Sequence, residues 1–184
     1  MTNQTVEFSR EINLQDLSSK EKRIAIMAEA GERKALEARI GIPSLTKLEA
    51  TVMLLNEGRS KGVSMVGKII AEGDQACIAS LKPVPFVMEE NLNIRFLAED
   101  LITPELEEEN LYTLESEDIE PYPAEGLLDI GELITQYFAL SLDLYPRAEG
   151  AELSTEQLKD ISVNEPLMEK PNPFAELAKL RNKT

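Results

Sequence analysis

Apolar residues fall on every second position between residues 48 and 54, where Leu48, Ala50, Val52 and Leu54 are separated mainly by polar residues. A period of two is typical of a β-strand with one buried face. The same pattern is clearest over residues 86–96 and recurs in the shorter run 63–69, and residues 75–81 are a further short strand candidate. This central part of the chain is therefore predicted to be β-sheet.

Short polar segments separate these runs. Residues 56–62 contain two glycines and have the composition of a turn, and the Glu-Gly-Asp sequence at 72–74 suggests a second, shorter turn. Strands joined by turns of a few residues pair as antiparallel neighbours, so the order along the chain predicts a β-meander. Residues 6–14 and 23–28 are additional strand candidates with less regular patterns.

Two helices are expected beside this sheet. Residues 31–40 consist of good helix formers and stop at Gly41 and Pro43. Asp129 and Glu132 have the spacing of a capping box and precede an apolar stripe that continues to Phe138. The combination predicts an α+β fold, an antiparallel β-meander sheet with flanking helices, an acidic loop and a C-terminal helix.

The last part of the chain has a different character. Residues 149–171 are polar and interrupted by proline, with at most one short helix near 156–160. Asn172 and Pro173 then provide the N-cap and first position of a terminal helix. The predicted organisation is a single domain over residues 1–148, including an acidic loop at 98–126, and a loosely attached tail over 149–184.

Negative charge is concentrated in one stretch. The chain has a net charge of −15, and the residues between Phe96 and Pro146 contain 14 Asp and Glu with no Lys or Arg. This asymmetry concerns partners and solubility rather than fold. Two interpretations remain open: a solvated acidic loop, or a surface that binds a basic partner.

The composition argues against most catalytic and metal sites. The chain has no His and one Cys, so it cannot build a Ser-His or Cys-His pair, and it has no Gly-rich phosphate loop. Structural zinc needs about four Cys or His ligands. We expect no enzymatic activity, no cofactor, and no catalytic, cofactor-binding or metal-binding residues. Cys77 is expected to be a small apolar residue in a buried strand.

The chain also lacks the features of membrane targeting. It has no run of about 18 apolar residues, and residues 1–12 have neither a basic region nor an apolar core of the signal-peptide kind. A cytoplasmic location is expected.

Several short motifs occur in a characteristic order. Cys77 is followed by Leu81, a Pro-Val step and a strand that ends in Ile94-Arg95-Phe96. Around them lie Phe8-Ser9-Arg10, the LLDIGEL sequence at 127–133, Pro146, and the NPFAEL sequence at 172–177. Together these motifs resemble the bacterial and plastid YceD family. The resemblance implies a role as a large ribosomal RNA subunit accumulation protein, that is, in ribosome biogenesis.

The chain departs from the family at one position. Many members carry a Cys-x-x-Cys-Leu pattern around this strand, whereas Ser80 occupies the second cysteine position here. This departure further weakens any metal hypothesis.

Direct RNA binding would need a local basic patch, because the protein is acidic overall. The candidates lie near the first helix, in the first turn and at the C-terminus: Arg33, Lys34, Arg39, Arg59, Lys61, Lys179, Arg181 and Lys183. Neighbouring Glu residues favour ordinary surface charge over RNA contact, so direct RNA contact is expected to be weak.

The expected partner is then a ribosomal protein or a large-subunit precursor, with the protein acting as an acidic escort. The alternative is an acidic interaction adaptor unrelated to ribosomes, and the oligomeric state is left open.

Overall fold

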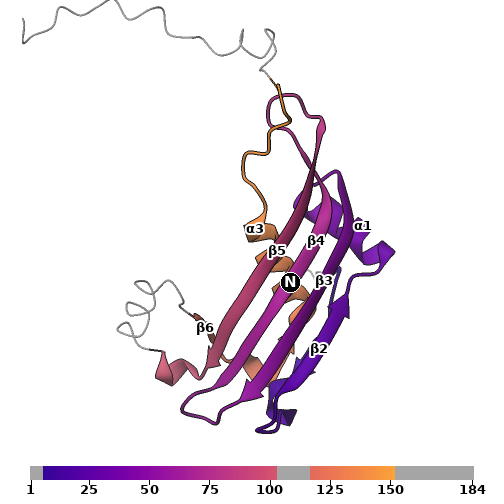
Figure 1. Ribbon diagram of the computed structural model, residues 1–184. Helices are drawn as coiled ribbons and strands as arrows, with labels where there is room; N and C mark the ends of the chain where they lie inside the picture. The colour runs from indigo at the N-terminus through magenta and orange to yellow at the C-terminus, as the bar shows by residue number, and fades with distance from the viewer. Residues whose placement is uncertain (1–5, 103–116, 152–184) are drawn as a thin grey trace, which may run out of the picture.

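The computed structural model describes residues 6–102 and 117–151 (Figure 1). A five-stranded sheet has the order β2-β3-β4-β5-β6, and a small second sheet pairs β1 with β7. The strands are β1 Glu11–Asn13, β2 Lys22–Met27, β3 Ser44–Asn56, β4 Val63–Ala76, β5 Pro83–Leu97, β6 Asp118–Pro121 and β7 Leu127–Asp129. The helices are α1 Ala30–Ile40 and α3 Ile130–Ser141, with short 3₁₀ turns at Leu14–Asp16 (η1), Glu99–Leu101 (η2) and Ala124–Gly126 (η3).

The predicted α+β fold is confirmed. Strands β2 to β5 form an antiparallel meander in chain order. The turn predicted at 56–62 joins β3 to β4, and the helix predicted at 31–40 is α1, which ends at Gly41 in a left-handed conformation. Of the candidate strand at 6–14, only β1 is a strand.

The turn predicted at residues 72–74 is wrong. Strand β4 runs through it, so the two short strands expected at 63–69 and 75–81 are one long strand that ends at Ala76. Gly73 does not turn the chain. A Cβ atom there would lie 2.3 Å from the backbone oxygen of Ser44. The glycine is needed because β3 and β4 approach closely at this point.

Strand β6 is the one parallel partner in the larger sheet, and the sequence pattern did not predict it. Its four residues pair with the end of β5, from Ile94 opposite Asp118 to Leu97 opposite Pro121. The connection between β5 and β6 contains residues 103–116, which lie outside the described part of the chain. The predicted acidic loop at 98–126 is thus described only at its two ends. The tail predicted at 149–184, with its terminal helix, lies outside the described residues from 152 onward.

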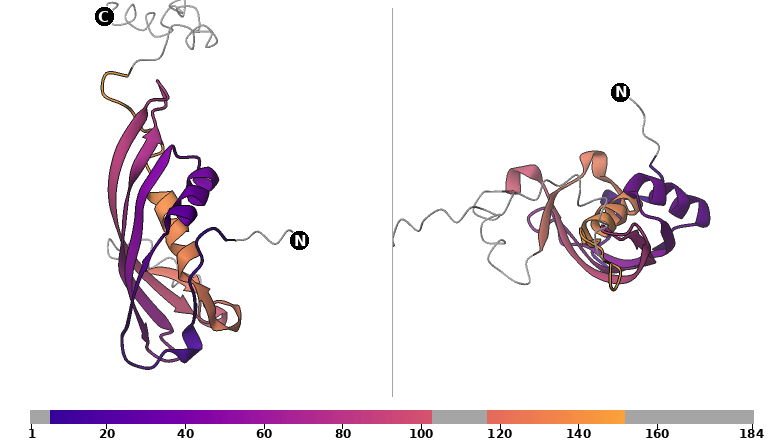
Figure 2. Two further views of the ribbon diagram at one scale, coloured as in Figure 1. Left: turned by 90° about the vertical axis from the view of Figure 1, so that its right-hand side faces the viewer. Right: turned by 90° about the horizontal axis from the view of Figure 1, so that it is seen from above.

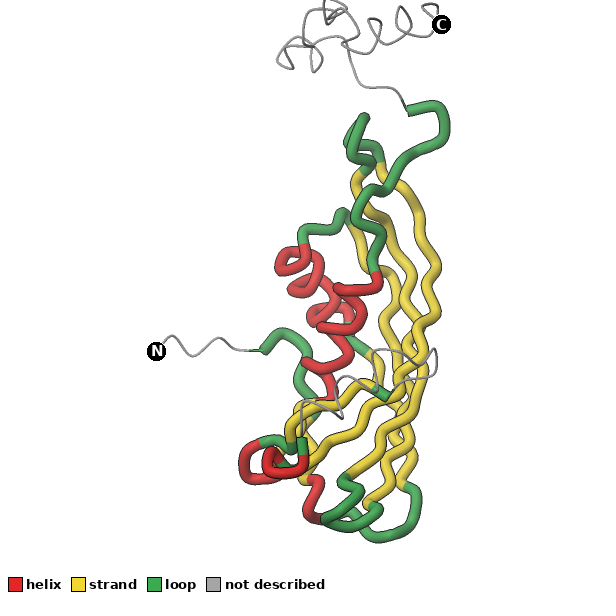
Figure 3. Tube along the Cα trace, turned by 90° about the vertical axis from the view of Figure 1, so that its left-hand side faces the viewer, coloured by secondary structure: helices red, strands yellow, loops and turns green. Residues whose placement is uncertain are grey.

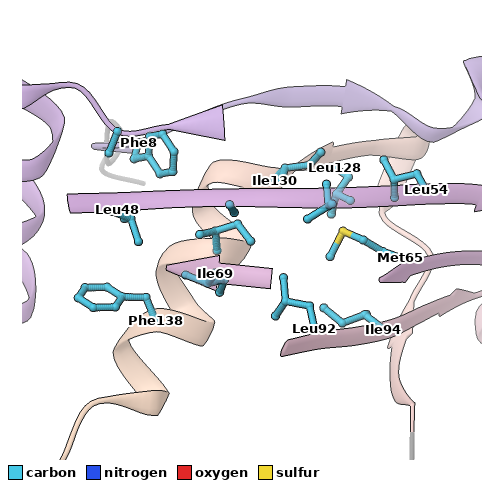
Figure 4. Packing of buried hydrophobic residues seen from close by; sticks show 14 of the residues in the cluster. Phe8, Leu48, Leu54, Met65, Ile69, Leu92, Ile94, Leu128, Ile130 and Phe138 are labelled. Atoms are coloured by element: carbon cyan, nitrogen blue, oxygen red, sulfur yellow. The ribbon is translucent and has the colours of Figure 1, made fainter. Parts of the chain in front are cut away.

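Both helices lie on one face of the larger sheet (Figures 2 and 3). The core forms between them and the sheet, where Phe138 and Ile134 of α3 are buried with Leu48 of β3 and Ile69 of β4 (Figure 4). Within the described residues, no helix or strand covers the opposite face. That face has a shallow hollow of about 690 Å³ with Met27, Met53, Val66 and Ile70 in its lining.

At the start of α3, the Phe-Ser-Arg motif and the LLDIGEL motif, which are far apart in the sequence, come into contact. The side chain of Asp129 caps the helix by accepting the N–H of Glu132 at 3.2 Å and also accepts the N–H of Arg10 at 2.8 Å. A Cβ atom on Gly131 would lie 2.4 Å from the backbone oxygen of Phe8. The Phe-Ser-Arg and LLDIGEL motifs therefore meet at one junction that only glycine fits. The capping-box prediction at Asp129 is confirmed for one of its two hydrogen bonds, the one that the Asp129 side chain accepts from the N–H of Glu132.

Candidate interaction site

Arg95 organises the acidic end of the sheet. Its guanidinium donates to Glu57 Oε2 at 2.6 Å, to Glu117 Oε1 at 2.7 Å and to the backbone oxygen of Lys61 at 2.9 Å. These contacts join the β3–β4 turn, β5 and the residue that precedes β6. The hydrogen bond from Arg95 lowers the pKa of the Glu117 carboxyl below its usual range. Arg95 belongs to a motif noted in the sequence, but only the structure shows that its role is to bind two carboxylates.

We define the acidic end as Glu57, Glu99, Asp100, Glu117, Asp118 and Glu120. These residues gather where β5 and β6 finish and where the 3₁₀ turn η2 follows β5. Glu99 and Asp100 are exposed, and the contact of Asp100 with Arg59 is long, at 3.8 Å. An exposed pair of this length contributes little to stability. Both carboxylates are therefore free to attract a cationic partner.

The other described acids of the stretch between Phe96 and Pro146 do not form one surface. Asp129 caps α3, Glu132 pairs with Arg39, and Asp143 accepts the N–H of Tyr145 at 2.9 Å. Even within the acidic end, Asp118 accepts the hydroxyl hydrogen of Tyr137 at 2.8 Å. Five of the nine described acids of this stretch, these four and Glu117, thus make contacts within the fold, a distinction that the linear sequence does not reveal. Glu105, Glu107, Glu108, Glu109 and Glu115 lie outside the described residues.

The basic residues proposed for RNA contact are largely engaged within the protein. Arg39 binds Glu7 and Glu132, Lys34 pairs with Glu37 at 2.7 Å, and Arg33 donates to the backbone oxygen of Ala28. Arg59 lies 3.8 Å from Asp100, and the backbone oxygen of Lys61 accepts a hydrogen bond from Arg95, so both residues lie beside the acidic end. The described candidates do not join into a basic stripe. Lys179, Arg181 and Lys183 lie outside the described residues.

Cys77 lies in the tight turn between β4 and β5 rather than in a strand. The expectation that it is buried is confirmed, and the expectation of a strand is wrong because β4 ends one residue earlier. Its sulfur accepts the N–H of Ala148 at 3.3 Å, while the N–H of Ile78 donates to the oxygen of Pro146 at 2.9 Å. The Ser80 side chain and the N–H of Ala148 stabilise the thiolate and lower the pKa of Cys77 to about 6. The hydrogen bonds from Ala148 to Cys77 and from Ile78 to Pro146 hold the chain segment that follows α3 against this turn.

The described part of the chain contains neither a metal-binding cluster nor a membrane-spanning helix. No group of three or more Cys, Asp or Glu side chains there is arranged to hold a metal ion. No described helix combines the length and the apolar character needed to cross a bilayer.

Comparison with known proteins agrees with the motif order. The family model of the large ribosomal RNA subunit accumulation protein YceD matches residues 65–181, which is more than half of the chain. The match includes β4 from Met65 onward, β5, the Cys77 turn, α3 and every residue of the acidic end except Glu57. Neither the curated proteins nor the solved structures yield a match. On the strength of the family match, this chain belongs to the YceD family of large ribosomal RNA subunit accumulation proteins.

Proposed function

We propose that this protein is a non-catalytic, cytoplasmic factor of large-subunit biogenesis that holds a basic ribosomal protein through its acidic end. The family name implies a role in the accumulation of large-subunit ribosomal RNA. The escort role rests on one observation: Glu99 and Asp100 are exposed at the acidic end, whereas the cations of α1 are engaged by carboxylates or backbone oxygens.

The physical argument for an escort is electrostatic. A ribosomal protein is basic and adheres to RNA non-specifically, and a complementary acidic surface suppresses that adhesion until delivery. With a net charge of −15, the protein itself is repelled by RNA phosphates. It can therefore hold a basic protein near RNA without competing for the RNA.

A pull-down with large-subunit ribosomal proteins over a salt series tests this role. One variant replaces Glu99 and Glu120 by Gln and Asp100 by Asn at the acidic end, and a second replaces Glu105, Glu107, Glu108 and Glu109 by Gln in the acidic sequence that follows β5. The matched control replaces three exposed acids elsewhere: Glu11, Glu21 and Glu149. Capture should weaken in both variants as it does when salt is raised for the unaltered protein, because loss of negative charge and added salt reduce the same screened attraction.

Equal capture by all the variants, with an unchanged salt response, would refute the escort role. Depletion of the protein from cells tests the wider proposal separately. Precursors of the large-subunit RNA should change while small-subunit RNA does not, and an unaltered precursor profile would argue against a biogenesis role.

A second candidate function is an interaction adaptor unrelated to ribosomes. Three apolar side chains, Leu140, Leu144 and Tyr145, are exposed at the end of α3 and just after it, and exposed apolar groups often mark interfaces. Sedimentation on a sucrose gradient separates the two functions. Comigration with large-subunit precursors supports the biogenesis factor, and recovery at the top of the gradient alone supports the adaptor.

A further inference from the structure

The outer edge of β5 offers unpaired backbone groups. The register between β4 and β5 is continuous from Val63 opposite Phe96 to Ala76 opposite Pro83. In such a ladder, successive residues direct their N–H and C=O groups to opposite sides. The backbone oxygen of Leu97 accepts the N–H of Tyr122 at 2.6 Å, so it points away from β4. The backbone N–H and C=O groups of the other odd-numbered residues of β5 therefore also point away from β4.

This parity identifies the free groups. Strand β6 pairs only with residues from Ile94 to Leu97. Val87, Glu89 and Asn91 therefore direct their N–H and C=O groups to an edge that no described strand occupies (Figure 1). Pro85, farther along the edge, offers only a carbonyl. An edge of this length is a template for an added strand.

An apolar stripe of α3 lies on the same side of the sheet. Leu133, Tyr137 and Leu140 have helical spacing that places them on one face of α3. The hydroxyl of Tyr137 donates to Asp118 of β6 at 2.8 Å, which orients this face toward the β6 side of the sheet. Leu140 is 82% exposed. A strand added beside β5 would cover this stripe.

The helix-facing side chains of β5 define the pattern that such a strand would need. Phe86 and Met88 are half-buried hydrophobic residues at the margin of the core. Glu90 comes next on the same face, half-buried and without an ion-pair partner among the described residues. Because side chains alternate along a strand, the complementary segment has two apolar residues and one basic residue at every second position.

Charge decides between possible occupants. The chain's own residues 103–116 carry Glu105, Glu107, Glu108, Glu109 and Glu115 and no cation, so they would be repelled by Glu90, whereas Glu89 is paired with Lys68. A second copy of the same edge would bring the same acids together, and like charges across a strand pair are destabilising. A basic segment of a partner neutralises Glu90 instead of adding negative charge beside it.

We propose that the edge of β5 at Val87, Glu89 and Asn91 binds an extended basic segment of a partner protein as an added strand. Backbone hydrogen bonds give the affinity, and pockets beside the edge select side chains. The identification of this partner as a ribosomal protein rests on the proposed function. The strand-addition site itself rests only on the geometry of β5 and α3.

A capped synthetic peptide probes the site without any ribosomal component. In this peptide two Val and one Lys alternate with Thr. Amide hydrogen exchange followed by NMR should show that Val87, Glu89 and Asn91 exchange fast in the free protein and are protected by the peptide. Protection of the Met88 and Glu90 amides should not change, because their N–H groups already face β4.

Two control peptides separate the contributions. The same peptide with N-methyl groups on the edge-facing amides should not protect these residues, because it cannot form the ladder. Replacing its Lys by Glu should weaken binding, and Glu90→Gln should abolish the preference for Lys over Glu.

A proline pair tests the edge in the protein. Asn91→Pro removes an edge-facing N–H and should lower affinity for the Lys peptide roughly tenfold or more. The matched control Ala25→Pro removes an edge-facing N–H of β2 at the opposite edge of the sheet and should leave affinity unchanged.

The proposal is overturned if the three amides exchange slowly in the free protein, since the edge would then already be covered. It is also overturned if the Lys peptide gives no protection or if the N-methylated peptide binds equally well. None of these outcomes bears on the ribosomal RNA profile, so a failed edge site and a failed biogenesis role are distinguishable.

Discussion

Arg39 at the end of α1 binds Glu132 in the first turn of α3 through two hydrogen bonds, Nη1 to Oε2 at 2.7 Å and Nη2 to Oε1 at 2.6 Å. The two helices are far apart in sequence and lie side by side on the sheet (Figure 2). A fork of this kind fixes both distance and orientation. The pair therefore sets how the helical layer is assembled.

Arg39→Met should lower the free energy of unfolding by about 1–2 kcal/mol, because it leaves Glu132 and Glu7 without their cation in a partly buried position. Lys34→Met is the control, since the pair of Lys34 with Glu37 is exposed on the lysine side and should contribute under about 0.5 kcal/mol. Urea unfolding curves measure both. Equal effects of the two substitutions would contradict the role assigned to Arg39.

The same pair predicts a pH dependence. The hydrogen bond from Arg39 holds the pKa of the Glu132 carboxyl below its ordinary value, which is about 4.3 in an unfolded chain. A lowered folded-state pKa gives stability that is complete above the unfolded value and is lost as pH falls through the folded value. The difference in stability between the unaltered protein and Arg39→Met should therefore shrink from about pH 5 to about pH 3. A constant difference over this range would show that the contribution is not ionic.

Gly131→Ala should destabilise the fold by about 1–3 kcal/mol or more, because the new methyl group would overlap the backbone of Phe8 and neither backbone can move freely. Gly31→Ala is the matched control within α1. Nothing lies within 4 Å of a Cβ atom at Gly31, so the substitution should stabilise by up to about 1 kcal/mol through helix propensity. Thermal unfolding of the two variants should shift in opposite directions, and shifts in the same direction would be inconsistent with the junction described above.

Cys77 should react slowly with a thiol reagent at pH 7 in the native protein. Its pKa of about 6 favours the reactive thiolate, but its side chain is fully buried under the segment that contains Ala148. The rate should rise to that of a free thiol in denaturant. Fast reaction without denaturant would mean that the segment after α3 is readily displaced.

Binding of the purified protein to unrelated RNA should be weak at physiological salt, since its charge is −15 and its described cations form no stripe. Fluorescence anisotropy over a salt series measures it. Submicromolar binding that weakens steeply with salt would reveal a basic patch in the residues that the structure does not describe.

Local patterns of the sequence were sufficient for much of the fold. The alternation along β3 and β5, the polar turn between β3 and β4, and the cap at Asp129 all predicted elements that the structure contains. These features depend on residues close together in the chain. Periodicity and capping express such short-range preferences directly.

Only the tertiary structure decided the remaining features. The Glu-Gly-Asp sequence at 72–74 has the composition of a turn, yet β4 runs through it. Position 73 is glycine because the backbone oxygen of Ser44, which is distant in sequence, leaves no room for a side chain. Likewise, the parallel pairing of β6 and the division of acids between caps, ion pairs and the acidic end depend on contacts between distant residues. A carboxylate has the same side chain in every role, so its function is set by which cation, amide or solvent the fold brings to it.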